Sequence, residues 1–197
     1  MDRLKAIQDT IQTSIELKQR FFAEHSETVL EAARQTAEAI RRGGKILIFG
    51  NGGSAADAQH FAAELVHRLD HTRPERPGIP ALALTTDSST ITAIANDASF
   101  TQVFSRQIVA LGRAEDVAIG ISTSGNSPNI VEAIRQANQM GMVTIGLLGK
   151  DGGQLRELVA IPLIVPHHIT ARVQEVHLII EHVLCELIEE ELFPESQ

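Results

Sequence analysis

The sequence contains no tryptophan or tyrosine, and aromatic residues fill only 4% of its 197 positions. Proteins that bind single-stranded nucleic acid stack the bases on aromatic side chains, so this mode of binding is disfavoured. The core must be built from Ala, Ile, Leu and Val, within a hydrophobic fraction of 43%. This composition suits one globular domain with a helical extension better than two separate cores.

Positive charge is also scarce. The 17 Lys and Arg residues are outnumbered by 25 Asp and Glu, which gives a net charge of -8 and a pI near 5.5. A duplex-binding surface needs clustered Lys and Arg to neutralise phosphates. Direct binding to nucleic acid is therefore not expected.

The chain has one cysteine and no long apolar run. Cys185 lies in the segment VLCELI and has no second cysteine to pair with, which fits a reducing compartment. The N-terminal residues MDRLKAIQDTIQ lack the apolar core of a signal peptide, and no run approaches the ~20 residues needed to span a bilayer. We expect a cytoplasmic protein without a membrane segment.

Helical periodicity dominates residues 1–44. The first predicted helix has apolar residues at Leu4, Ile7, Ile11 and Ile15, and the second has them at Val29, Ala33, Ala37 and Ile40. Ser26 is the expected N-cap of the second helix, and Gly43 and Gly44 end it. The first helix has no obvious partner within the chain, so we predict that these helices pack in an oligomer.

From Lys45 onward the pattern changes to short, continuously apolar runs. Such runs are typical of buried parallel strands. The runs are KILIFG, PALALTT, VAIGIS, MVTIGLL and IPLIV. Helical segments separate several of them, and a long amphipathic helix is predicted from about Ala171 to Leu192. This alternation predicts an α/β fold, a three-layer sandwich with right-handed crossovers, over residues 45–197.

Two of the predicted strands run into loops of small polar residues. These are GNGGSA at 50–55 and STSGNS at 122–127, and a helical pattern follows each. Ligands bind at such loops in open α/β sheets. Hydroxyl groups, backbone N–H groups freed by Gly125 and the positive end of the next helix form an uncharged cradle for phosphate. The alternative is a simple capped helix start.

GNGGSA also matches the dinucleotide-binding fingerprint, with Gly50, Gly52 and Ala55 in its three small positions. That fingerprint requires an acidic residue at the end of the second strand, about 20 positions on. Asp70 has this spacing but precedes the second strand, in a Pro-rich loop. Nicotinamide binding is therefore the less favoured interpretation.

Two pairs of side chains have the spacing of metal ligands. His60 and Glu64 share one helical face at i and i+4, and Gln174 and His182 lie about two turns apart on the last helix. Two imidazoles, a carboxylate and an amide oxygen could bind zinc or a related divalent ion. The alternative is a surface His/Glu pair that contributes little to the stability of the helix.

Several separate motifs together resemble the bacterial phosphoheptose isomerases. They are GNGGSAADAQHFAAEL, ALTTDSSTITAIAND, ISTSGNSPNI, LLGKDGG and ITARVQEVHLIIEHVLCELI, in the order of that family, and they extend from about Lys45 to the C-terminus. The resemblance implies a SIS domain, with a five-stranded parallel sheet in flavodoxin-like order. It also implies a homotetramer with active sites at the subunit boundaries.

The resemblance also implies roles for individual residues. Glu64 and His182 match the acid–base pair of the family. The metal ligands, expected to hold one zinc ion per subunit, are His60, Glu64, Gln174 and His182. The substrate-binding positions are Asn51, Gly52, Gly53, Glu64, Asn96, Asp97, Ser122, Thr123, Ser124, Ser127 and Gln174.

The expected activity is aldose–ketose isomerisation of sedoheptulose 7-phosphate to D-glycero-D-manno-heptose 7-phosphate through an enediol, a step of heptose biosynthesis for lipopolysaccharide, capsule or another glycan. The alternative is a non-catalytic SIS-domain tetramer that binds the replication initiator DnaA. That relative lacks the acid–base pair, whereas Glu64 and His182 are both present here.

Ala171 stands where other isomerases have an acidic residue. A sugar-phosphate-sensing regulator is disfavoured because no helix-turn-helix segment is evident in residues 1–44.

Overall fold

The computed structural model describes residues 2–70, 72 and 75–194, and its centre is a sheet of five parallel strands. The strands lie in the order β2-β1-β3-β4-β5, so the predicted parallel sheet and its flavodoxin-like order are confirmed. Their bounds are β1 (Ile46–Gly50), β2 (Ala81–Ala83), β3 (Val117–Ser122), β4 (Val143–Gly149) and β5 (Ile161–Val165).

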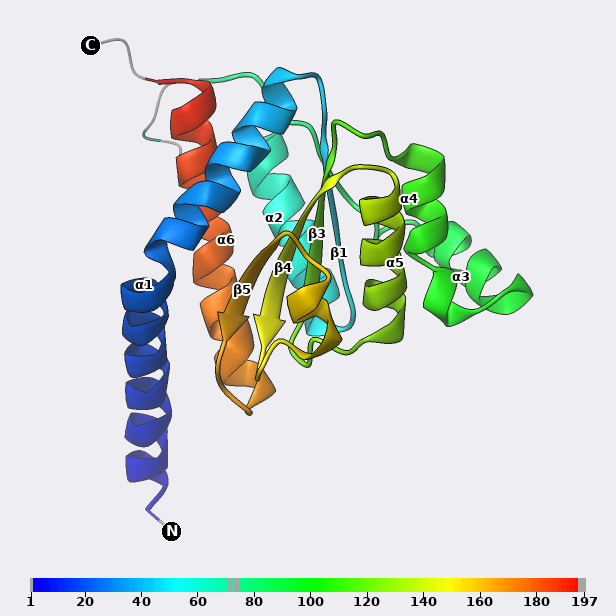
Figure 1. The fold of residues 1–197 in the computed structure, drawn as a ribbon. Helices are drawn as coiled ribbons and strands as arrows, with labels where there is room; N and C mark the ends of the chain where they lie inside the picture. Colours follow the sequence, from blue (N-terminus) through cyan, green and yellow to red (C-terminus); the bar gives the residue numbers. More distant parts are fainter. Residues whose placement is uncertain (1, 71, 73–74, 195–197) are drawn as a thin grey trace.

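Helices cover both faces of this sheet (Figure 1). One apolar cluster joins one face of the sheet to helices α1, α2 and α6, and a second joins the other face to α4 and α5. The α-helices are α1 (Arg3–Arg41), α2 (Gly53–Val66), α3 (Ser88–Asp97), α4 (Ser105–Leu111), α5 (Pro128–Gln139) and α6 (Thr170–Leu192), with short 3-10 helices η1 (Phe100–Gln102) and η2 (Gly153–Glu157). The predicted three-layer sandwich is therefore confirmed.

The N-terminal region is one helix and not the two that were predicted. Helix α1 runs without a break from Arg3 to Arg41, because residues 16–28 contain neither proline nor glycine. Ser26 does not cap a helix start: its hydroxyl donates to the carbonyl oxygen of Phe22, one turn earlier. The helix ends as predicted, with Gly43 in the left-handed region at φ +86°.

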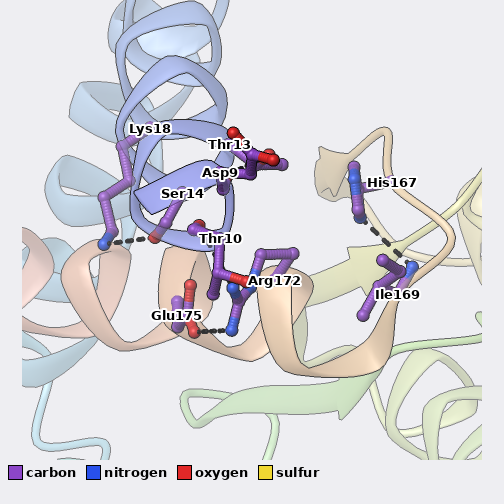
Figure 2. A network of polar contacts seen from close by, with 9 residues as sticks. All are labelled: Asp9, Thr10, Thr13, Ser14, Lys18, His167, Ile169, Arg172 and Glu175. Carbon is purple, nitrogen blue, oxygen red and sulfur yellow. Dashed lines mark hydrogen bonds and ion pairs between the residues drawn. The ribbon is translucent and has the colours of Figure 1, made fainter. Parts of the chain in front are cut away.

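The two halves of α1 have different surroundings. Its second half packs against α6, and Val29, Ala33 and Ala37 are buried there. Its first half projects beyond the sheet (Figure 1). The first half is attached to the start of α6 by Arg172, which donates to the carbonyl oxygen of Thr10 at 3.2 Å and forms an ion pair with Glu175 (Figure 2).

Within residues 2–70, 72 and 75–194, no helix is long and apolar enough to cross a membrane. Helix α6 has the bounds expected from its amphipathic pattern, to within one residue. Helices α2 and α6 share one apolar cluster on the same face of the sheet and pack against each other. This pairing positions the candidate site.

Candidate functional site

The loops that follow β1 and β3 meet at one edge of the sheet. The two strands pair in parallel with Gly50 opposite Ile121, so both chains leave the sheet on the same side. The side-chain amides of Asn51 and Asn129 then join the loops through two reciprocal hydrogen bonds of 2.9 and 2.8 Å. Sequence reasoning missed Asn129, which lies in the first turn of α5.

The loop of residues 122–127 places hydroxyl groups at the start of α5. The Ser122 and Ser127 hydroxyl oxygens are 3.2 Å apart, and Ser127 is the N-cap residue, although its side chain does not cap the helix. Gly125 has φ +65°, and a Cβ there would lie 1.9 Å from the carbonyl oxygen of Gly152, so only glycine fits. A helix N-terminus beside hydroxyl groups is suited to bind an anion.

Helices α2 and α6 bring together three of the four predicted metal ligands. His60 Nε2 lies 2.9 Å from His182 Nε2, and the two rings meet edge to face at 71°. His60 Nδ1 lies 3.6 Å from Glu64 Oε1. Residues 122 positions apart in sequence therefore meet across the two helices.

As these side chains stand, they do not yet form a closed ligand set. Glu64 lies beside Nδ1 of the His60 ring, whereas His182 lies beside the other ring nitrogen, Nε2. Across the part of the chain that the structure describes, no group of three His, Cys, Asp or Glu side chains has a metal-binding arrangement. The donors nevertheless suit a divalent ion, because two ligand nitrogens of tetrahedral zinc are ~3.3 Å apart, close to the spacing of the two imidazoles.

Gln174 lies in the first turns of α6, against the segment that follows β1. A Cβ on Gly53 would lie 2.2 Å from Gln174 Nε2, so the absence of a side chain at Gly53 makes room for this amide. Gly52, the residue before it, caps α2 with φ +57°. The Gly52–Gly53 turn therefore connects the β1 loop with the helix that carries His182.

Two further carboxyl groups lie near the histidines in sequence, the half-buried Asp57 and the buried Glu181, and sequence reasoning missed both. Asp57 lies one turn before His60, and Glu181 precedes His182. Burial, reinforced by the Asp57 charge, raises the pKa of Glu181 to about 9, so this side chain is neutral at pH 7. Burial also raises the pKa of Asp57, although His60 opposes the shift.

Among the described residues, the side chains of Asn96 and Asp97 form no hydrogen bond with the other predicted site residues. Both are exposed at the end of α3, where the Asn96 amide donates to Asp97 Oδ1 at 2.7 Å. The apolar side of α3 packs in the cluster of α4 and α5, across the sheet from α2 and α6 (Figure 1). Helix α3 thus lies on the same face of the sheet as α5, which begins directly after the 122–127 loop.

Comparison with known proteins identifies the family. The SIS domain model matches residues 11–149. The chain is 54% identical to the phosphoheptose isomerase of Trichlorobacter lovleyi (93% of this chain, 92% of the relative) and 51% identical to that of a Roseiflexus species (95% and 93%).

Solved structures agree with these relatives. The phosphoheptose isomerase of Neisseria gonorrhoeae matches with a TM-score of 0.87 at 43% identity, covering 95% of this chain and 98% of that one. The Francisella tularensis enzyme matches with a TM-score of 0.91 at 38% identity, covering 96% and 100%. The chain therefore belongs to the phosphoheptose isomerases, within the SIS domain family.

Proposed function

We propose that this isomerase interconverts sedoheptulose 7-phosphate and D-glycero-D-manno-heptose 7-phosphate. The observation that carries the proposal is that Glu64, His60 and His182 meet across two helices that are far apart in sequence. The chain is also about half identical to named phosphoheptose isomerases. The alternative, a non-catalytic protein that binds the replication initiator, is not favoured by these relatives.

The reaction moves one proton between two carbons. Glu64 takes the proton from C1 of the ketose while His182 gives a proton to the carbonyl oxygen on C2, which forms the enediol. His182 then takes the proton of the C1 hydroxyl as Glu64 returns its proton to C2, which forms the aldose. Both side chains end in their starting states, so the cycle closes.

His60, Glu64, Gln174 and His182 would hold the divalent ion, which we propose is zinc. When bound, such an ion supplies Lewis-acid polarisation of the carbonyl oxygen. A carboxylate that donates to a metal is a weaker base than a free one. Ligand exchange during turnover would relieve this conflict: Glu64 lies beside His60 Nδ1 and away from the facing Nε2 atoms, so it would have to move to join an ion held by those atoms.

The phosphate would bind where the 122–127 loop meets α5. The Ser122 and Ser127 hydroxyls, with those of Thr123 and Ser124, can donate to its oxygens, and the helix N-terminus favours its charge. Asn51 and the Gly52–Gly53 turn lie between this loop and Gln174, which suits them to contact the sugar.

Replacing Gly53 with alanine tests this contact. The new Cβ would displace the Gln174 amide, which is the free end of a flexible side chain, so the fold should survive. We expect kcat/KM to fall by about 10-fold, because a small misplacement of a positioning group is costly. Steady-state kinetics measure the loss. Gly53 is not among the glycines with a positive φ, so the new Cβ adds no backbone strain, and circular dichroism checks that the variant is folded.

We further propose that the enzyme is a cytoplasmic homotetramer. The first half of α1 exposes an apolar stripe, with Leu4, Ile7, Ile11 and Ile15 exposed by 72%, 57%, 54% and 43%. A contiguous stripe of this kind on a projecting helix is typical of a helix–helix interface.

Charged residues in the stripe should dissociate the assembly. We expect the double substitution Ile7→Glu and Ile11→Glu to convert tetramers to smaller species, because like charges would face each other in an apolar interface. Sedimentation velocity at micromolar concentration measures the change. Lys5→Glu, on another side of the same helix, should leave the tetramer intact. A wild-type monomer at that concentration would refute the proposal.

Turnover tests the proposed function directly. The chain, supplied with zinc, is incubated with sedoheptulose 7-phosphate while formation of the aldose phosphate is followed. Accumulation of D-glycero-D-manno-heptose 7-phosphate is the expected result. No turnover with metal present, together with tight binding to the replication initiator, would favour the alternative.

A further inference from the structure

The C-terminal end of α2 needs partners for its carbonyl groups. The last four carbonyl oxygens of an α-helix have no N–H donor within the helix, and they carry the negative end of the helix dipole. In α2 the Ala63 carbonyl accepts from the backbone of His67 at 2.9 Å, and the Leu65 carbonyl accepts from the backbone of Ile79 at 3.0 Å. The last turn of α2 contains no basic residue, so neither bond brings a positive charge.

Arg76 supplies that charge from the following loop. Its guanidinium donates through Nη2 to the carbonyl oxygen of Glu64 at 3.2 Å and through Nη1 to that of Leu65 at 3.0 Å. A cation at a helix C-terminus is favourable, and the guanidinium fork can bond two carbonyls at once. Arg76 therefore holds the backbone of the residue whose side chain is the proposed base.

The same guanidinium is attached to α6. Arg76 Nε donates to Glu189 Oε2 at 2.5 Å, and the two side chains are only 4% and 11% exposed. Glu189 follows His182 by about two turns on α6. Cys185, between His182 and Glu189 on α6, is buried.

We propose that Arg76, held by Glu189, is a positioning residue for catalysis: it fixes the Glu64 turn of α2 against the α6 helix that carries His182. The inference rests on the proposed function, since it concerns the geometry of that acid–base pair. Arg76 contacts Glu64 through the backbone, and the loops suited to phosphate lie at the other end of α2. The loss of Arg76 should therefore affect the chemical step more than substrate binding.

Arg76→Met tests the inference. It keeps much of the side-chain volume and removes all the hydrogen bonds to the two helices. We expect kcat to fall by ~10- to 100-fold, the size of effect that a misplacement of about 1 Å produces, while KM stays within about twofold. Circular dichroism and thermal unfolding establish the folded fraction, and the assay is run well below the unfolding transition.

Conservative variants separate positioning from stability. Arg76→Lys keeps the charge but cannot bond two carbonyls and a carboxylate at fixed angles, so its kcat should lie between those of Arg76→Met and the wild type. Glu189→Gln keeps an acceptor oxygen and should lose less than Arg76→Met. Both remain informative if Arg76→Met does not fold. The matched control is Arg41→Met, which breaks the Arg41–Glu191 pair between α1 and α6 and should leave kcat unchanged.

The outcomes are distinct for the two proposals. A lower kcat at constant KM in folded Arg76 variants, with partial rescue by lysine, supports the positioning role. A wild-type kcat in folded Arg76→Met, or an equal loss in Arg41→Met, overturns the inference and leaves the proposed function standing. A wild-type chain that does not isomerise the heptose phosphate, with zinc supplied, overturns the proposed function and the inference with it.

Discussion

Glu64→Gln is expected to lower kcat by ~10²- to 10⁴-fold with little change in KM, because the amide cannot accept the proton from C1. The substitution preserves the size of the side chain, and among the described residues Glu64 forms no ion pair with arginine or lysine whose loss would unfold the site. Steady-state isomerisation of sedoheptulose 7-phosphate measures the effect.

The same chemical change at an exposed position is the control. Glu157 lies on η2 with 85% of its side chain exposed, so Glu157→Gln should retain wild-type kcat. If Glu64→Gln kept most of its activity, Glu64 would not be the base. A rise in KM at constant kcat would instead indicate that Glu64 contributes to uniform substrate binding.

Removal of the metal is expected to have the second large effect. Lewis-acid polarisation of a carbonyl is worth several kcal/mol, so thorough chelation should lower kcat by ~10²-fold or more, and added zinc should restore it. The facing Nε2 atoms of His60 and His182, 2.9 Å apart, are the observation behind this expectation. Full activity after chelation, with no metal detected in the sample, would contradict it.

Metal content provides a readout that does not depend on turnover. His182→Asn should lose bound zinc, because it removes one of the two facing nitrogens. His168→Asn replaces an exposed histidine in the loop before α6 and should bind zinc as the wild type does. Equal zinc content in the two variants would remove His182 from the ligand set.

Much of the fold could be predicted because its signals are local. Five apolar runs with helical segments between several of them predict a parallel sheet, and the bounds of α6 follow from its amphipathic pattern. The continuity of α1 could not be read from the same pattern. Ser26 is a favourable N-cap residue, but the same hydroxyl can donate to the carbonyl one turn earlier, and only the backbone conformation decides between the two.

The candidate site was predictable only in part for a similar reason. The pairing of His60 with Glu64 follows from helical spacing, whereas its meeting with His182 depends on how α2 packs on α6. Arg76 lies 113 residues from Glu189, and no spacing rule connects them. The Asn51–Asn129 pair, 78 residues apart, is of the same kind. The ligand set and the substrate contacts remain predictions.

Isomerisation in D₂O is the most direct test of the acid–base account. If Glu64 carries the proton between C1 and C2, deuterium from the solvent should enter the carbon-bound positions of the sugar phosphates during prolonged equilibration with the wild-type enzyme. Nuclear magnetic resonance detects it, and Glu64→Gln should incorporate it far more slowly. Complete isomerisation with no deuterium on carbon would indicate direct hydrogen transfer between the two carbons and would contradict the account.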